Sequence, residues 1–218
     1  MEVEANGLQD SLESNEIEKR KVGLMRARVE SADPSSKDLD DFMIRRFLRA
    51  RDLDIDKASA LLLKYLGWRR AFIPNGYISA SEIPNELAQN KLFMQGFVVY
   101  SLEKICASMP GGEEKFISIA DIEGWGYTNS DIRAYLAALS ILQDCYPERL
   151  GKLFLVHVPY VFMTAWKVVY PFIDSKTKKK IIFVENKNIK STLLGDIDEN
   201  QLPDVYGGKL PLVPIQDS

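Results

Sequence analysis

Few side chains in this sequence belong to the types that carry out acid–base, nucleophilic or metal chemistry. The chain has one histidine, His157, which lies in the apolar run KLFLVHV. A serine hydrolase would require a G-x-S-x-G turn, and the sequence contains none. Cys106 and Cys145 are too few and too widely spaced for a zinc site or a disulfide framework. We therefore expect His157 to be a packed strand residue, and we expect neither catalytic residues nor a bound metal.

The segment from Gly124 to Asn129, GWGYTN, comes nearest to a nucleotide-binding turn. It follows an expected strand and precedes an expected helix, but Asn129 stands where a dinucleotide fingerprint needs its third glycine for close helix–strand packing. Asp121 and Glu123 alternate with apolar residues just before this turn, and nothing else in the sequence completes an acid–base pair around them. The prediction is a binding protein without a cofactor, and a nucleotide-dependent enzyme is the weaker alternative.

Two adjacent segments remain that could bind a ligand. Residues 160–172, YVFMTAWKVVYPF, are apolar on more than one helical face, so a helix there would be buried or would meet another apolar phase. Tyr and Trp are also favoured at membrane interfaces. Residues 176–180, KTKKK, follow directly and form either a solvated turn or a loop that meets phosphate beside the apolar helix. Both alternatives stay open at this point.

The composition is globular, with 46% apolar and 27% charged residues. The net charge of -3 comes from residues 1–41, which hold eleven acidic and six basic side chains, so the rest of the chain is weakly basic. A weakly basic body suits an anionic membrane surface better than a nucleic acid. No signal sequence and no apolar run of about 18 residues occurs. We expect a cytoplasmic protein that contacts membranes peripherally.

The expected secondary structure changes character along the chain. Residues 1–36 are expected to form a mobile polar tail with one helix near residues 17–29. Asp54 is expected to be the N-cap of a helix that ends before Pro74. From residue 96 onward, helices are expected at 97–108, 129–146 and 160–172, and strands at 115–122, 152–158 and 180–184. A short helix at 80–87 precedes them. Alternation of strands and helices predicts the α/β class with mainly parallel strands and crossover helices.

Three motifs occur in a distinctive order. Residues 47–51 read FLRAR and lead into an amphipathic helix that ends near Trp68, residues 146–152 read YPERLGK, and residues 202–208 read LPDVYGG. Together they resemble the CRAL-TRIO family of lipid-binding proteins, in its phosphatidylinositol-transfer branch, from about residue 38 to 214. The resemblance implies a small helical lobe beside an α/β lobe whose short strands surround a lipid cavity.

The same resemblance implies a headgroup site. Glu148 of the YPER motif would accept hydrogen bonds from inositol hydroxyls, and Thr177 and Lys180 would bind the phosphate. An arginine of the FLRAR stretch, either Arg49 or Arg51, would be a fourth ligand.

The resemblance also assigns a gate helix and a second-lipid position. The gate residues are Phe162, Met163, Trp166, Val169 and Tyr170. The family binds phosphatidylcholine through a pair of hydroxyl residues on one strand. Ser118 matches one of the pair, but Phe116 stands at the other position and cannot form that hydrogen bond.

The sequence departs from the family pattern at Gln95-Gly96-Phe97. Family members have a D-x-x-G-R-P-V strand and a linker after the Q-G pair, whereas here the following helix is joined to it directly. We therefore expect one early strand to be missing, which would expose an edge of the sheet.

These observations lead to one overall expectation. Residues 1–36 form the tail, 37–95 a helical lobe and 96–214 the CRAL-TRIO-like lobe. The expected function is to hold a phospholipid, with phosphatidylinositol favoured, and to exchange it at membranes during phosphoinositide signalling and membrane trafficking. The alternative is a lipid sensor or scaffold that does not transfer lipid. The expected partners are the lipid and a transient membrane surface, with no nucleic acid, and the protein is expected to be a monomer.

Overall fold

A computed structural model describes residues 2–83, 95–126 and 131–217, with side chains from residue 13 onward. The chain forms two compact units: residues 1–76 with 144–148, and residues 77–143 with 149–218. The expected domain boundaries at residues 37, 95 and 214 stay predictions, and each unit is described by itself.

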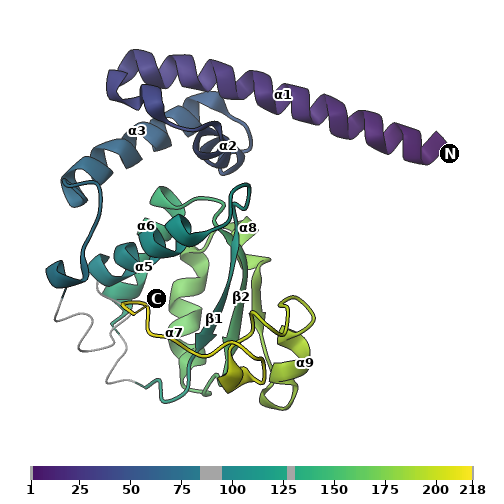
Figure 1. The fold of residues 1–218 in the computed structure, drawn as a ribbon, viewed down its shortest axis with the longest axis vertical. Coiled ribbons are helices and arrows are strands. Elements are labelled where there is room, and N and C mark those ends of the chain that lie inside the picture. Colours follow the sequence, from purple (N-terminus) through teal and green to yellow (C-terminus); the bar gives the residue numbers. More distant parts are fainter. Residues whose placement is uncertain (1, 84–94, 127–130, 218) are drawn as a thin grey trace. The chain divides into compact units, whose positions relative to one another are not determined.

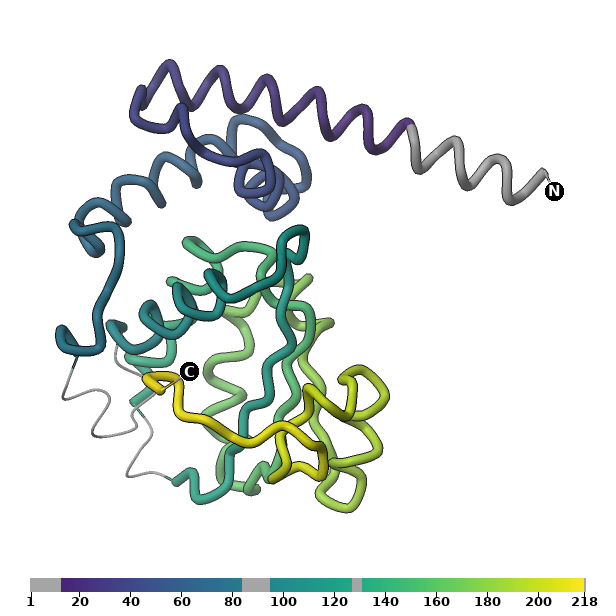
Figure 2. Tube along the Cα trace, in the orientation of Figure 1, coloured from purple at the N-terminus to yellow at the C-terminus, as the bar shows by residue number. Residues whose placement is uncertain are grey.

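The first unit begins with α1 (Glu2–Ala32), a continuous helix where a mobile tail was expected. Val22, Met25 and Val29 recur at helical spacing and are at most 4% exposed, because this stripe packs on α2 (Asp41–Arg49) and α3 (Ile55–Phe72). The sequence contained this stripe, but it has only three members and they lie among basic residues of an otherwise polar segment. Tertiary packing makes the helix part of a folded unit (Figure 2).

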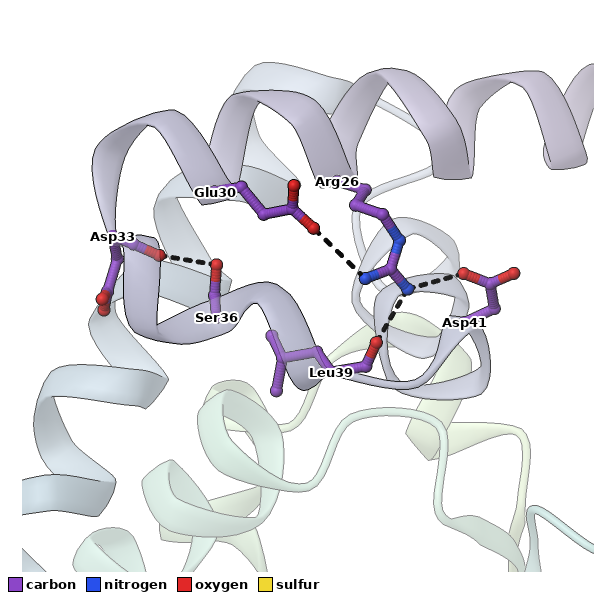
Figure 3. A network of polar contacts seen from close by, with 6 residues as sticks. All are labelled: Arg26, Glu30, Asp33, Ser36, Leu39 and Asp41. Atoms are coloured by element: carbon purple, nitrogen blue, oxygen red, sulfur yellow. Dashed lines mark hydrogen bonds and ion pairs between the residues drawn. The ribbon is translucent and has the colours of Figure 1, made fainter.

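The corner between α1 and α2 is fastened by an arginine (Figure 3). Arg26 Nη2 donates to the Leu39 carbonyl and to the Asp41 carboxylate, both at 2.7 Å, and Nη1 lies 3.5 Å from Glu30. The turn η1 (Pro34–Asp38) lies between the helices, and Ser36 Oγ donates to the Asp33 carbonyl. Side chains of α1 thus fix where α2 begins.

Both following helices start at aspartate caps. The Asp40 carboxylate accepts from the Met43 amide at 2.6 Å, and that of Asp54 accepts from Lys57 at 3.0 Å, which confirms the expected cap at Asp54. Phe47 and Leu62 are among the fully buried side chains of α2 and α3.

The second unit contains a sheet with helices around it (Figure 1). Its helices and turns are η2 (Ala80–Glu82), α5 (Gln95–Ser108), α6 (Ile132–Cys145), α7 (Phe162–Val169), η4 (Tyr170–Phe172), α8 (Ser175–Lys178), η5 (Asn186–Asn188), α9 (Ile189–Leu193) and η6 (Asp204–Tyr206). Its strands are β1 (Phe116–Asp121), β2 (Leu150–Val156) and β3 (Ile181–Phe183). The last two residues of α6 are grouped with the first unit.

The sheet among the described residues has three parallel strands in the order β1-β2-β3. Ile119 pairs with Phe154, which in turn pairs with Ile182. Parallel strands joined by α6 and α7 confirm the expected α/β class. Of the expected helix at 80–87, the described part is the short turn η2, and residues 84–87 lie outside the described residues.

One face of the sheet carries a tightly packed core. Its members come from β2, from the residue that follows β3, from α9 and from the segment that leads to the closing glycines, and they are Phe154, Val156, Val184, Ile189, Leu193 and Leu202. Because successive side chains of a strand point to opposite faces, Ser118 lies on the other face of β1, and the strand register shifts between Phe116 and Ile117. Burial on that other face is uneven, since Leu155 is 3% exposed and Phe183 is 41% exposed.

The described structure near residue 95 agrees with the expectation that the early strand after Gln95-Gly96 is missing. Helix α5 runs without interruption from Gln95 to Ser108, and β1 is an edge strand of the sheet in the described part of the chain. The residues just before α5, 84–94, lie outside the described residues.

Candidate headgroup and gate site

The expected gate segment forms α7 and η4 and carries a row of aromatic rings. Phe162 and Trp166 stack with ring centroids 6.2 Å apart, and Trp166 contacts Tyr170 at 5.6 Å. Trp166 also meets the ring of Phe183 on β3 edge-on at 5.2 Å, so α7 lies over the sheet face that bears Phe183. Met163 and Val169 are half-buried on the same helix.

Several apolar side chains of this segment remain in solvent. Tyr160 is 94% exposed and Phe172 is 59% exposed, and Val168 and Tyr170 are nearly half exposed. Large apolar side chains grouped in this way typically mark a contact surface. Basic residues follow at once, and Lys178 Nζ lies 4.5 Å from the centroid of the Tyr170 ring.

The junction after the gate segment is organised by Asp174, the N-cap of α8. Its Oδ1 accepts from the Lys176 amide at 2.9 Å and from the Thr177 amide at 2.8 Å, and the Thr177 hydroxyl also bonds this carboxyl group. Burial by itself would raise the pKa of Asp174, but the hydrogen bonds from Thr177 and Lys176 outweigh it and lower the pKa. The carboxylate therefore stays ionised at neutral pH and orients Thr177.

Thr177 and Lys180 lie on a turn between α8 and β3. The Lys180 amide donates to the Thr177 carbonyl at 2.9 Å, and the Lys180 carbonyl accepts from the Leu153 amide of β2. The charge of Lys180 also lowers the pKa of Asp174, which places the ammonium group near that carboxylate. The structure thus brings two of the expected phosphate ligands together on one anchored turn.

A second group supports the same junction from α6. Gln143 Nε2 donates to the Phe172 carbonyl at 3.3 Å, and Gln143 Oε1 accepts from the Asp174 amide at 2.8 Å. Sequence reasoning missed both Gln143 and Asp174. The only available signal was the position of Asp174 just before a short polar helix, which is typical of an N-cap.

The other expected headgroup ligands belong to the first unit. Arg49 forms a two-pronged ion pair with Glu18, with Nε and Nη2 at 2.6 and 2.8 Å from the two carboxylate oxygens. Arg51 Nη1 donates to the Ala50 carbonyl, and its Nη2 lies 3.7 Å from Asp144. Glu148 has a φ of 58°, a left-handed conformation that is uncommon outside glycine. Their headgroup roles stay predictions.

The second-lipid position lies on β1. Phe116 and Ser118 are both half-buried, and the strand register shifts between Phe116 and Ile117. Phe183, which is in the same sheet and in contact with Trp166, is still 41% exposed. This side of the sheet therefore offers apolar surface that the described side chains do not fully cover.

The single histidine is not the packed core residue that the sequence suggested. His157 has a φ of 49° and follows β2, which brings Nδ1 to 3.0 Å from both oxygens of Asp121, and the His157 side chain is 32% exposed. Asp121 also accepts from the Tyr206 hydroxyl at 3.1 Å and from the Glu123 amide at 3.0 Å.

Asp121, Glu123 and His157 hold potential metal-ligand atoms within 4.8 Å of one another. The oxygens of Asp121 are already used by three donors, so the arrangement is explained as a hydrogen-bonded network. Of the possible nucleotide-binding turn, Gly124 has a φ of 70°, and Tyr127–Asn129 lie outside the described residues.

None of the helices in the described ranges is both long and apolar enough to traverse a lipid bilayer.

Comparisons with known proteins identify the family of the chain and support its fold. The model of a family described as the CRAL/TRIO domain matches residues 73–208. The Sec14 cytosolic factor of Schizosaccharomyces pombe is 27% identical over 245 aligned positions, which cover 92% of this chain and 82% of that protein. Patellin-4 of Arabidopsis thaliana is 27% identical over 204 positions, covering 77% of this chain and 38% of its own length.

Among solved structures, the crystal structure of Sfh5 matches with a TM-score of 0.58 at 18% identity, and 81% of each chain is covered. This similarity supports the fold. The alignment to the S. pombe protein spans 245 positions although this chain has 218 residues, so gaps open in this chain.

Proposed function

Because the chain belongs to the CRAL/TRIO domain family, we propose that it binds a phospholipid and exchanges it at membranes, with phosphatidylinositol as the ligand. The observation that carries this proposal is the direct succession of an apolar, partly exposed gate segment and the turn that bears Thr177 and Lys180. A lipid has the same two parts, an acyl region and a phosphate, joined end to end.

The polar turn has the chemistry that a phosphodiester needs. Lys180 supplies a positive charge. The single proton of the Thr177 hydroxyl is donated to Asp174 in this structure, and on lipid binding it would turn to donate to a phosphate oxygen. The resemblance adds Glu148 as an acceptor for inositol hydroxyls and Arg49 or Arg51 as a further cation. No catalytic group and no cofactor is part of this proposal.

The apolar side of the proposal rests on the face of the sheet that α7 covers. Phe183 and Trp166 contact each other there, and Phe183 keeps part of its surface exposed. Each CH₂ group of an acyl chain that leaves water contributes about 0.8 kcal/mol. Tyr160 and Phe172 would meet the membrane during exchange, when the contact is peripheral and transient.

A lipid sensor or scaffold that retains its ligand is the second candidate. The edge position of β1 within the described residues and the uninterrupted helix α5 favour it, because a sheet that lacks an early strand could hold lipid without efficient exchange. Lipid extraction without transfer would distinguish this candidate from a transfer protein.

Transfer of labelled phosphatidylinositol between vesicles, combined with native mass spectrometry of the purified full chain, tests the proposal. Lys180→Ala is expected to reduce transfer about tenfold, since a charge-assisted hydrogen bond is lost. Lys179→Ala is the matched control, because it removes the same charge from the same exposed loop. Absence of both bound lipid and transfer in the unmutated protein would refute the function, and equal losses in the two variants would refute the role of Lys180.

A further inference from the structure

One side-chain amide of α6 joins the end of the gate segment to the start of the headgroup turn. Gln143 donates to the carbonyl of Phe172, the last residue of η4, and accepts from the amide of Asp174, the cap of α8. The two bonds measure 3.3 and 2.8 Å. A glutamine side-chain amide has one carbonyl and one amino group. It therefore accepts from one backbone amide and donates to one backbone carbonyl, as a peptide group would.

The residue between the two bonded backbone groups is the anchor of the junction. Ile173 is only 5% exposed, whereas Phe172 before it is largely exposed. The solvent-facing apolar segment therefore ends at Phe172, and the next residue, Ile173, is held in place by burial. The hydrogen bonds of Gln143 and the burial of the Ile173 side chain together fix the backbone at this junction.

The effect of this anchor extends to Thr177 through Asp174. The backbone of Asp174 is held by Gln143, and its carboxylate holds the amide and the hydroxyl of Thr177. Any shift of the Asp174 backbone would carry its carboxylate along and would displace Thr177, whose amide that carboxylate holds.

We propose that Gln143 is a positioning residue, which fixes the Asp174 cap and with it the position of Thr177, and holds the end of the gate segment so that bound lipid is released slowly. This inference rests on the proposed function, because it assigns Thr177 to the lipid phosphate. Lipid retention then depends on Gln143 as well, although this residue lies outside the binding turn.

The test uses Gln143→Met in the full chain, because Met matches the length of Gln and offers neither strong donor nor acceptor. Release of fluorescent phosphatidylinositol from the loaded protein is expected to become about tenfold faster, since two ordinary hydrogen bonds are lost. Gln201→Met makes the same chemical change at an exposed turn of the same unit and is expected to leave release unchanged.

A double-mutant cycle separates positioning from general weakening. If Gln143 acts through Thr177, adding Gln143→Met to Thr177→Ala is expected to accelerate release far less than it does in the unmutated chain. Additive effects, or release from Gln143→Met no faster than from Gln201→Met, would overturn the proposal.

Amide hydrogen exchange provides a readout that does not depend on lipid. Gln143→Met is expected to speed exchange at the amides of Asp174, Lys176 and Thr177, and unchanged protection there would overturn the anchor itself. If the unmutated protein binds no phosphatidylinositol, the proposed function fails, and these exchange rates alone then decide whether the anchor exists.

Discussion

The Tyr206 hydroxyl donates a hydrogen bond to the carboxylate of Asp121 across 3.1 Å, although 85 positions separate the two residues. Tyr206 belongs to the LPDVYGG motif, and Asp121 ends β1. His157, just after β2, donates from Nδ1 to the same carboxylate, since an ionised carboxylate can only accept. The bond therefore ties the closing motif to the carboxyl ends of two strands.

Tyr206→Phe is expected to lower the free energy of unfolding by about 1 kcal/mol, the net contribution of one hydrogen bond of this kind. Burial, and then the nearby charge of Asp121, raise the pKa of Tyr206 to about 12, so the hydroxyl keeps its proton at neutral pH. Urea denaturation measures the loss. Tyr77→Phe, at a side chain that is 67% exposed, is the matched control, and equal midpoints for the two variants would contradict the prediction.

The pH dependence of stability follows from Asp121. Burial alone would raise its pKa, but hydrogen bonds from Glu123, His157 and Tyr206 outweigh burial and lower the pKa below the usual 3.8. A lowered pKa means that the stabilisation is fully present above about pH 4 and is lost as the pH falls through the lower folded-state value.

Asp121→Asn is therefore expected to be less stable than the unmutated protein at pH 6 and to lose less of its stability between pH 4 and pH 3. Urea midpoints along this pH series provide the measurement. Asp217→Asn, at an exposed turn near the C-terminus, serves as the control and should follow the unmutated protein. An identical slope for the Asp121 variant would show that the network contributes nothing to acid stability.

Gly208→Ala is expected to destabilise the second unit by more than about 2 kcal/mol, because the backbone there is too close to accept a side chain. A Cβ atom at this position would lie 2.0 Å from the Leu202 carbonyl oxygen, and Leu202 is itself in the core. Thermal denaturation provides the comparison. Gly111→Ala, where a Cβ would have no neighbour within 4 Å, should be close to neutral, and a similar tolerance at Gly208 would refute the packing argument.

Glu18→Gln is expected to weaken the attachment of α1 by about 1–2 kcal/mol. Glu18 is 9% exposed and bonds Arg49 twice, while the Arg49 side chain is 38% exposed, so the loss should be smaller than for a fully buried pair. Hydrogen exchange of the α1 amides measures the effect. Glu16→Gln changes an exposed residue of the same helix, and equal exchange in both variants would argue against the ion pair.

Phe172→Ser is expected to reduce binding to anionic vesicles several-fold, because burial of one aromatic side chain in the membrane is lost. Vesicle sedimentation at fixed salt gives the bound fraction. Leu212→Ser removes an apolar side chain that is 64% exposed in the C-terminal segment and should bind like the unmutated protein. If the two variants lose the same amount, the gate segment is not the contact surface.

Several parts of the fold were predictable because they depend on neighbours in the sequence. The N-cap at Asp54 acts on a residue three positions away, and the strands around Ile119, Phe154 and Ile182 have the short apolar runs of a parallel sheet. The expected helix of α1 was confined to residues 17–29. The observed helix is longer and packed, since α2 and α3 cover its stripe.

Of the candidate site, residue pattern pointed to the apolar segment 160–172 and the basic run 176–180, and the family resemblance then assigned roles to Thr177, Lys180 and the gate residues. The sequence did not reveal Gln143, because a glutamine in a helix has no pattern that marks a partner 31 positions away. His157 was misassigned for a similar reason. An apolar strand suggests burial, and only the left-handed turn after β2 directs the ring to Asp121.

Residue order and periodicity thus decided the α/β class, the helix cap at Asp54 and the family, since these depend on contacts within a few positions and on motifs that the chain carries in any conformation. Tertiary structure decided which polar groups meet: Glu18 with Arg49, Tyr206 with Asp121, and Gln143 with the Asp174 backbone. Hydrogen bonds require distances near 3 Å and defined angles, and these arise only after distant segments have folded against one another.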